Sequence, residues 1–182
     1  LNLAITLGEA DKKILIVDCD LRKPVLHKYL HLSRKTNGLT TVLSGKCTLD
    51  SAIVIFKDIK IDVLTAGAIP PNPTEILASE KMEKLVTELS KRYDYIIFDT
   101  PPVSVVTDAA VLGRLADGAL LVIRQKFATS EAVRAAKQNL ESVGVHVIGA
   151  VLSRFDYKTL SKDRGYYANY EYNYVQHAGT DS

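Results

Sequence analysis

Tryptophan is absent from this sequence of 182 residues, and cysteine occurs only twice. Cys19 and Cys47 form neither a CxxC pair nor a metal-ligand spacing, so we expect a reduced, cytosolic setting. No apolar run approaches the roughly 20 residues that a membrane-spanning helix requires. A dominant charge is also missing, because 23 Lys and Arg face 21 Asp and Glu, which leaves a net charge of +2. This balance argues against nucleic acid or an anionic membrane as a required partner.

Short apolar runs rich in β-branched residues alternate with helical patterns along the chain. The runs predict strands at residues 14–17, 61–65, 95–98, 119–123 and 147–152. Because their hydrophobicity is continuous, they are typical of strands that are buried on both faces. Strands that alternate with helices predict an α/β fold, a three-layer sandwich around a mostly parallel sheet. The length suits one domain, which we expect to span residues 1–156.

Two helices are well marked between these strands. An apolar stripe at helical spacing covers residues 82–89, and Pro73 is expected to open this helix with Thr74 as its N-cap. A second helix is expected over residues 130–143, followed by Gly144, a suitable residue for the turn after a helix. Residues 1–5 also look helical but have no cap before them, so the chain is expected to be a fragment that lacks its N-terminus.

The tyrosines are concentrated at the C-terminal end. Six of the nine lie from Tyr157 onward, and five of these fall within residues 166–174: Tyr166, Tyr167, Tyr170, Tyr172 and Tyr174. The surrounding residues 157–182 lack the aliphatic side chains that a core requires, which predicts a flexible tail. The alternative is an edge strand in which Tyr170, Tyr172 and Tyr174 form one aromatic face.

Carboxylates follow two of the predicted strands directly. Asp18 and Asp20 follow the strand at 14–17, and extended geometry would turn both to the same side. Asp99 follows the strand at 95–98, which is the pattern of the acid that helps to hold Mg²⁺ in P-loop nucleotidases. Ligands of parallel sheets collect beyond the carboxyl ends of the strands. We therefore predict a site for Mg²⁺ and nucleotide phosphate there, where Arg22 could meet a phosphate in fork geometry.

Other interpretations of these acids stay open at this point. A single acid after a strand is often a turn or capping residue, and DxD also binds metal in nucleotide-sugar glycosyltransferases. The phosphate-binding loop GxxxxGK[ST] is absent, since Gly45-Lys46 is followed by Cys47 and is not preceded by a strand. A phosphate cradle is therefore expected upstream of Leu1, or else the protein does not bind nucleotide in this way.

Taken together, these residues resemble the bacterial tyrosine kinases of capsule and exopolysaccharide biosynthesis, which are P-loop proteins related to the MinD and ParA ATPases. Residues 14–22 resemble the family's Walker A′ motif, and residues 98–102 resemble its Walker B motif. Residues 38–45, 66–77 and 108–116 are also typical of the family. The segment PPNPTEIL within residues 66–77, joined to a tyrosine-rich tail, is the most specific of these features.

The resemblance implies roles for particular side chains. Asp18 would accept the proton of the attacking tyrosine hydroxyl, with Arg22 as a second catalytic residue. Asp20 and Asp99 would hold Mg²⁺ with ATP. Ser153 and Arg154 stand where related ATPases often place an asparagine that contacts the base, and they are assigned to the cofactor site on that basis.

The resemblance also implies substrates, partners and location. The tail tyrosines Tyr166, Tyr167, Tyr170, Tyr172 and Tyr174 would be autophosphorylated between neighbours in a homo-oligomeric ring. A transmembrane activator, separate or fused, would hold the protein at the cytoplasmic face of the cell membrane, and a cognate tyrosine phosphatase would reverse the modification. Alternative functions are a MinD- or ParA-type ATPase switch, a non-catalytic scaffold with the same fold and, third, the glycosyltransferase.

Overall fold

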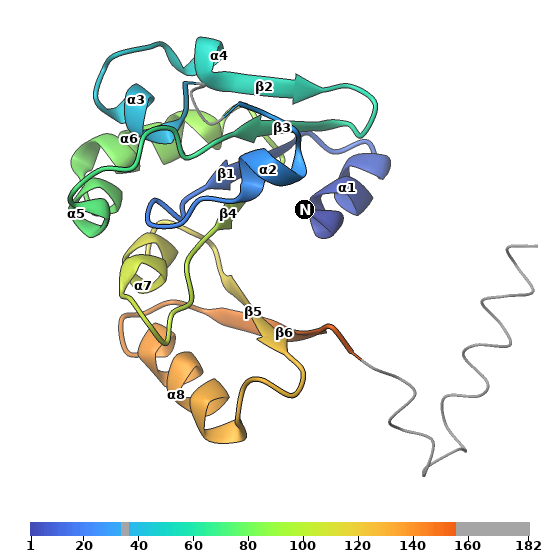
Figure 1. Ribbon diagram of the computed structural model, residues 1–182, viewed down its shortest axis with the longest axis vertical. Helices are drawn as coiled ribbons and strands as arrows, with labels where there is room; N and C mark the ends of the chain where they lie inside the picture. The colour runs from blue at the N-terminus through green and yellow to red at the C-terminus, as the bar shows by residue number, and fades with distance from the viewer. Residues whose placement is uncertain (34–36, 156–182) are drawn as a thin grey trace, which may run out of the picture.

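The computed structural model describes residues 1–33 and 37–155, and Figure 1 shows the arrangement of their helices and strands. In chain order the elements are α1 (Asn2–Glu9), β1 (Ile14–Asp18), α2 (Leu26–Tyr29), α3 (Leu39–Leu43), α4 (Leu49–Ala52), β2 (Ile53–Phe56), β3 (Ile61–Leu64), α5 (Pro73–Leu77), α6 (Glu80–Leu89), β4 (Tyr95–Asp99), α7 (Asp108–Gly113), β5 (Ala119–Arg124), α8 (Ser130–Glu141) and β6 (Val147–Ser153). Each predicted strand is present, and the α/β class is confirmed. The tyrosine-rich tail lies outside the described residues.

The strands form two sheets. Four of them make a sheet in the order β2-β3-β1-β4, in which β1 pairs in parallel with both β3 and β4. The short strand β2, which was not predicted although its residues form an apolar run, pairs with β3 in antiparallel fashion at the edge. The strands β5 and β6 pair in parallel with each other and form the second sheet.

The central strand β1 explains why the larger sheet is sandwiched between helices. All five of its residues are buried. Leu15 and Val17 pack on one face with residues of α3, α4, α5, α6 and α7, whereas Ile14 and Ile16 pack on the other face with residues of α1 and α2. Burying an aliphatic side chain of this size stabilises a fold by about 1.5 to 3 kcal/mol. The predicted three-layer arrangement is therefore confirmed for this sheet.

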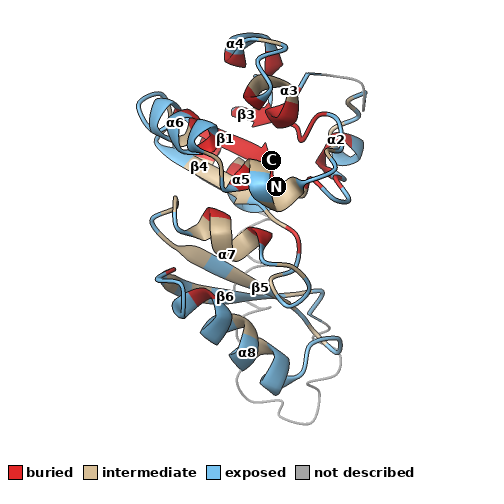
Figure 2. Ribbon diagram, turned by 90° about the vertical axis from the view of Figure 1, so that its left-hand side faces the viewer, coloured by how far each residue is buried: buried red, intermediate tan, exposed pale blue. Residues whose placement is uncertain are grey.

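The β5–β6 sheet departs from the prediction that every strand is buried on both faces. Figure 2 shows the buried residues gathered around β1 and β3, while β5, β6 and α8 are largely intermediate or exposed. Val122 in β5 is 71% exposed and Ile148 in β6 is 64% exposed. The physical reason is that α8 lies on one face of this pair (Figure 1), where Leu121 and Ile123 of β5 and Val133 of α8 line a shared hollow. The apolar residues on the opposite face of the two strands keep much of their surface in contact with solvent.

The helix expected from Pro73 onward is in fact two helices. Helix α5 ends at Leu77, and α6 begins after Ser79, whose hydroxyl oxygen accepts a hydrogen bond from the Met82 amide (3.3 Å). The N-cap position of α5 is Asn72, so the prediction of Thr74 as N-cap was wrong. Thr74 uses its hydroxyl in a contact with another element, described below. The helix predicted at 130–143 is confirmed as α8, and Gly144 follows it with a φ of +84°.

Candidate active site at the strand ends

The strand ends of β1 and β4 bring two of the predicted acids side by side. Asp18 and Asp99 are register partners at the last position of the parallel pair. The pairing continues one step further, because the Cys19 amide donates a hydrogen bond to the Asp99 carbonyl oxygen (2.8 Å). Each apolar run ends in its acid, so the hydrophobic core that aligns the two strands also places the two carboxylates at one edge of the sheet.

Asp18 is a buried carboxylate with one oxygen unused. The residue is 1% exposed, and its Oδ1 accepts a hydrogen bond from the Asp20 amide (3.2 Å). Among the described residues, Oδ2 has no hydrogen-bond partner. Burial, together with the nearby charge of Asp99, raises the pKa of Asp18 to about 7. An unpartnered buried carboxylate oxygen is costly, so this atom is suited to a proton or a cation.

Asp20 shapes the loop that follows β1. Its Oδ1 accepts hydrogen bonds from the amides of Arg22 (3.2 Å) and Lys23 (2.9 Å). Aspartate side chains commonly turn a chain through such bonds to residues two and three positions ahead. The extended geometry expected to align Asp18 with Asp20 therefore ends at Asp18, where β1 ends, and the chain turns at Asp20.

The donor set at these strand ends fits a hydrated hard cation. Asp99 is exposed as a whole residue, but partial desolvation of its carboxyl and the charge of Asp20 raise its pKa. Within the described ranges, no three His, Cys, Asp or Glu side chains gather closely enough to form a complete protein cage for a metal. Mg²⁺ typically binds through one or two carboxylates and keeps water and phosphate oxygens as its other ligands. Asp18 and Asp99, side by side at the strand ends, fit that requirement, and a contact of Asp20 with the ion stays a prediction.

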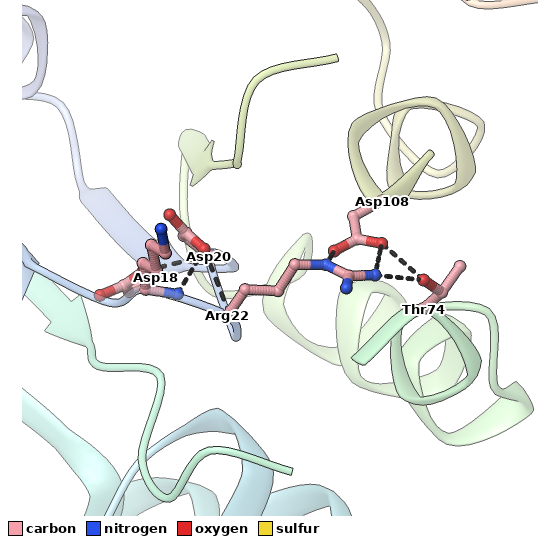
Figure 3. Close-up of polar contacts among 6 residues, drawn as sticks. Asp18, Asp20, Arg22, Thr74 and Asp108 are labelled. Carbon is pink, nitrogen blue, oxygen red and sulfur yellow. Dashed lines mark hydrogen bonds and ion pairs between the residues drawn. The ribbon is translucent and has the colours of Figure 1, made fainter. Parts of the chain in front are cut away.

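Arg22 lies in the same loop, but its side chain extends away from Asp18 and Asp20 and toward Asp108 (Figure 3). Its Nε donates to Asp108 Oδ2 (2.7 Å), and its Nη2 donates to Asp108 Oδ1 (3.0 Å) and to Thr74 Oγ1 (3.0 Å). The hydroxyl of Thr74 in turn donates to Asp108 Oδ1 (2.6 Å). The contact of Arg22 with phosphate stays a prediction, since in this structure its fork engages a carboxylate of the protein.

Thr74 and Asp108 were not identified as site residues from the sequence. Both lie in segments that carry the family resemblance, 66–77 and 108–116, which was the only signal available. Arg22 and Asp108 are 86 positions apart, so no local periodicity or motif spacing in the sequence indicates that they pair.

Ser153 and Arg154 lie at the end of β6, in the other sheet. The Ser153 hydroxyl donates to the Ile123 carbonyl oxygen of β5 (3.2 Å), and Arg154 has a φ of +52°. The structure therefore places them apart from the β1–β4 pair in sheet order, and their contact with a nucleotide stays a prediction.

The five candidate phosphoacceptor tyrosines lie outside the described residues. In the described part of the chain, no helix is long and apolar enough to cross a membrane.

A mostly parallel sheet between two helical layers, with carboxylates at the ends of adjacent strands, is the arrangement found in the class of P-loop nucleotidases. Comparisons with known proteins agree with this class. The AAA domain family matches residues 1–147. The septum site-determining protein MinD of Pyrococcus horikoshii, solved with Mg-ADP, is similar with a TM-score of 0.69 and 25% identity, over 85% of this chain and 63% of that chain.

Relatives with higher sequence identity define the family more narrowly. The tyrosine-protein kinase YwqD of Bacillus subtilis is 41% identical over 96% of this chain and 73% of its own length. The tyrosine-protein kinase wzc of Salmonella typhimurium is 38% identical over 94% of this chain, which spans 24% of that relative. The kinase domain of Escherichia coli tyrosine kinase ETK has a TM-score of 0.78 and 38% identity, over 85% of this chain and 62% of that chain. The chain belongs to the bacterial tyrosine-protein kinases, and the predicted family is confirmed.

Proposed function

We propose that the native protein transfers the γ-phosphoryl group of ATP to tyrosine at the ends of β1 and β4. The observation that carries this proposal is the unpartnered, buried Oδ2 of Asp18 beside Asp99. Phosphoryl transfer depends mainly on positioning and on neutralising charge, and bound Mg²⁺ supplies that neutralisation. Asp20 and Asp99 would hold the ion, directly or through water.

Asp18 accepts the proton of the tyrosine hydroxyl in this proposal. A general base must be able to take up a proton near neutral pH, and in the metal-free protein burial and the charge of Asp99 raise the pKa of Asp18 to about 7. Its position at the end of a strand that is buried throughout also supports the role, because the surrounding core fixes the carboxylate in place.

The acceptor tyrosines are Tyr166, Tyr167, Tyr170, Tyr172 and Tyr174 in this proposal. They belong to a tail of residues 157–182 that follows a kinase domain of residues 1–156. Each phosphate would add about 1.5 to 2 negative charges, so repeated modification of a short segment would repel it from an acidic site and from neighbouring tails. Autophosphorylation within a ring of copies would in this way loosen the ring.

The wider setting follows from the family. We propose that the protein acts in capsular or exopolysaccharide synthesis and export, at the cytoplasmic face of the cell membrane. A transmembrane activator would hold it there, and a cognate tyrosine phosphatase would reset the tail. The relatives named tyrosine-protein kinase YwqD and putative tyrosine-protein kinase CapB support the kinase activity on which this setting depends.

The fate of labelled phosphate tests the proposal against a MinD-type switch. The native protein is incubated with Mg²⁺ and ATP labelled at the γ-phosphate. A kinase places the label on protein tyrosine, and alkali-stable label in the protein band is the expected result. Release of nearly all the label as inorganic phosphate would identify an ATPase switch, and retention of intact ATP would identify a scaffold.

A further inference from the structure

Asp108 is the buried centre of a contact that joins three segments of the chain. Its side chain is 0% exposed, whereas the side chain of Arg22 is 39% exposed. Two parallel N–H groups of Arg22 reach the two oxygens of this carboxylate, and Thr74 donates to one of the same oxygens. Asp108 begins α7, Thr74 lies at the start of α5, and Arg22 lies in the loop after β1. The contact therefore fixes that loop to two helix starts.

The other end of Arg22 is tied to the candidate metal ligand. Its backbone amide donates to Asp20 Oδ1, and the Asp20 amide donates to Asp18 Oδ1. A chain of hydrogen bonds thus runs from Asp108 through Arg22 and Asp20 to Asp18, as Figure 3 shows. Movement of the Arg22 side chain would release the turn that orients the Asp20 carboxylate.

We propose that Asp108 and Thr74 are positioning residues of the active site, which act by clamping Arg22 and so holding the Asp18–Lys23 loop in the geometry that binds Mg²⁺ and phosphate. The inference rests on the proposed function for its catalytic consequence. The inference also makes Arg22 a positioning residue, because its Nε and Nη2 groups already donate to Asp108.

Burial of its carboxylate distinguishes this pair from the other ion pairs between described residues, whose carboxylates are exposed. Arg92 and Asp50 approach equally closely (2.6 Å), but the Asp50 side chain is 78% exposed. Exposed pairs contribute little because water competes for both partners. A buried carboxylate that loses its cation is strongly disfavoured, so the structure keeps Arg22 in place. The bidentate geometry also requires arginine, because a lysine ammonium has no planar fork.

Hydrogen–deuterium exchange of the native protein without nucleotide tests the clamp directly. In Asp108→Asn, peptides that cover residues 18–24 are expected to exchange about tenfold faster, the factor that loss of one hydrogen bond to a charged group produces. Asp50→Asn is the matched control, and its exchange at 18–24 is expected to equal that of the wild type. Wild-type exchange at 18–24 in Asp108→Asn would overturn the inference.

Arg22→Lys provides a second route that keeps both charges of the pair. Lysine keeps the positive charge but lacks the planar guanidinium, so Arg22→Lys is also expected to accelerate hydrogen exchange at residues 18–24. This variant tests the clamp even if Asp108→Asn folds poorly. The double variant is expected to exchange no faster than the faster single variant, because both changes break one contact. Additive acceleration would show two independent effects and would contradict the clamp.

The kinase assay then separates positioning from general stability. Asp108→Asn is expected to raise the Mg²⁺ concentration for half-maximal rate about tenfold and to recover most of the wild-type rate at saturating Mg²⁺. An unchanged Mg²⁺ requirement with a reduced maximal rate would indicate a structural role alone and would overturn the catalytic part. If the wild type places no phosphate on tyrosine, the proposed function fails, whereas the exchange result still decides whether the clamp exists.

Discussion

At the scale of single residues, the buried carboxylate of Asp18 lowers the stability of the fold but suits the proposed proton transfer. It ends a strand of fully buried residues, and one of its oxygens has no partner among the described residues. Deprotonating it leaves a buried charge beside Asp99, which explains why its pKa is raised to about 7. Strain of this kind persists at sites where a ligand or a proton completes the arrangement.

The cost can be measured by replacing the carboxylate with its neutral isostere. Asp18→Asn is expected to abolish tyrosine phosphorylation and to raise the free energy of unfolding at pH 8 by about 1 to 3 kcal/mol, measured without nucleotide or Mg²⁺.

The pH dependence of that gain follows from the direction of the shift. A carboxyl whose folded pKa is raised binds its proton more tightly when folded, so wild-type stability falls as pH rises from about 4 to 7. Thermal unfolding at pH 8 and pH 5 is expected to give a larger gain for Asp18→Asn at pH 8. An equal gain at both values would contradict the assignment of a raised pKa.

At the scale of elements, the sequence was most informative where one physical cause dominates. The continuous apolar run at 14–17 predicted β1 because a short, β-branched apolar run is typical of a strand buried on both faces, and the acids after it marked the site. Competing signals were harder to resolve. Ser79 can cap a new helix in the middle of a continuous helical pattern, and it does so in the structure.

Contacts between distant segments could not be predicted from local pattern. Thr74 has the side chain of a good N-cap, yet its hydroxyl bonds to Asp108, 34 positions away. The edge strand β2 was not predicted although Ile53–Phe56 is a continuous apolar run, because it follows the short helix α4 directly, and whether so short a run joins a sheet edge depends on its neighbours in space. These features depend on which elements meet in space, which the residue types alone do not specify.

The start of α3 provides a test at this scale. The amides of Leu39 and Thr40 donate to carbonyl oxygens beyond the end of β3, at Thr65 (2.7 Å) and Ala66 (3.1 Å). Gly38 has extended φ and ψ values that any residue can adopt, but a Cβ there would overlap the Thr65 carbonyl oxygen and the Gly67 backbone.

Gly38→Ala is therefore expected to lower the free energy of unfolding by at least about 2 kcal/mol, because rigid backbone on both sides must move apart. Gly149→Ala is the matched control, since its added Cβ would meet only Leu120 Cδ1, at 3.8 Å. Chemical denaturation of both variants measures the difference. Equal losses would show that the close approach of α3 to the end of β3 is not tightly packed.

At the scale of the whole molecule, stability and function are distributed unevenly. The four-stranded sheet and the helices and loops packed against it contain most of the buried residues, and the sheet carries Asp18 and Asp99 at its strand ends. The β5–β6 sheet exposes apolar side chains such as Val122 and Ile148, so it contributes less burial. The candidate site thus belongs to the part of the described chain with the best-packed core, as catalytic geometry requires.

The central claim joins this site to the tyrosine cluster, and phosphosite mapping tests it most directly. The native wild-type protein and its Asp99→Asn variant are incubated with Mg²⁺ and ATP, and phosphorylated peptides are identified by mass spectrometry. Asp58 is exposed, so Asp58→Asn serves as the control. Circular dichroism checks that each variant is folded. The account predicts phosphate within residues 166–174 in the wild type and the control, and a decrease of at least about 100-fold in Asp99→Asn. An unmodified tail in the active wild type, or undiminished phosphorylation in folded Asp99→Asn, would contradict it.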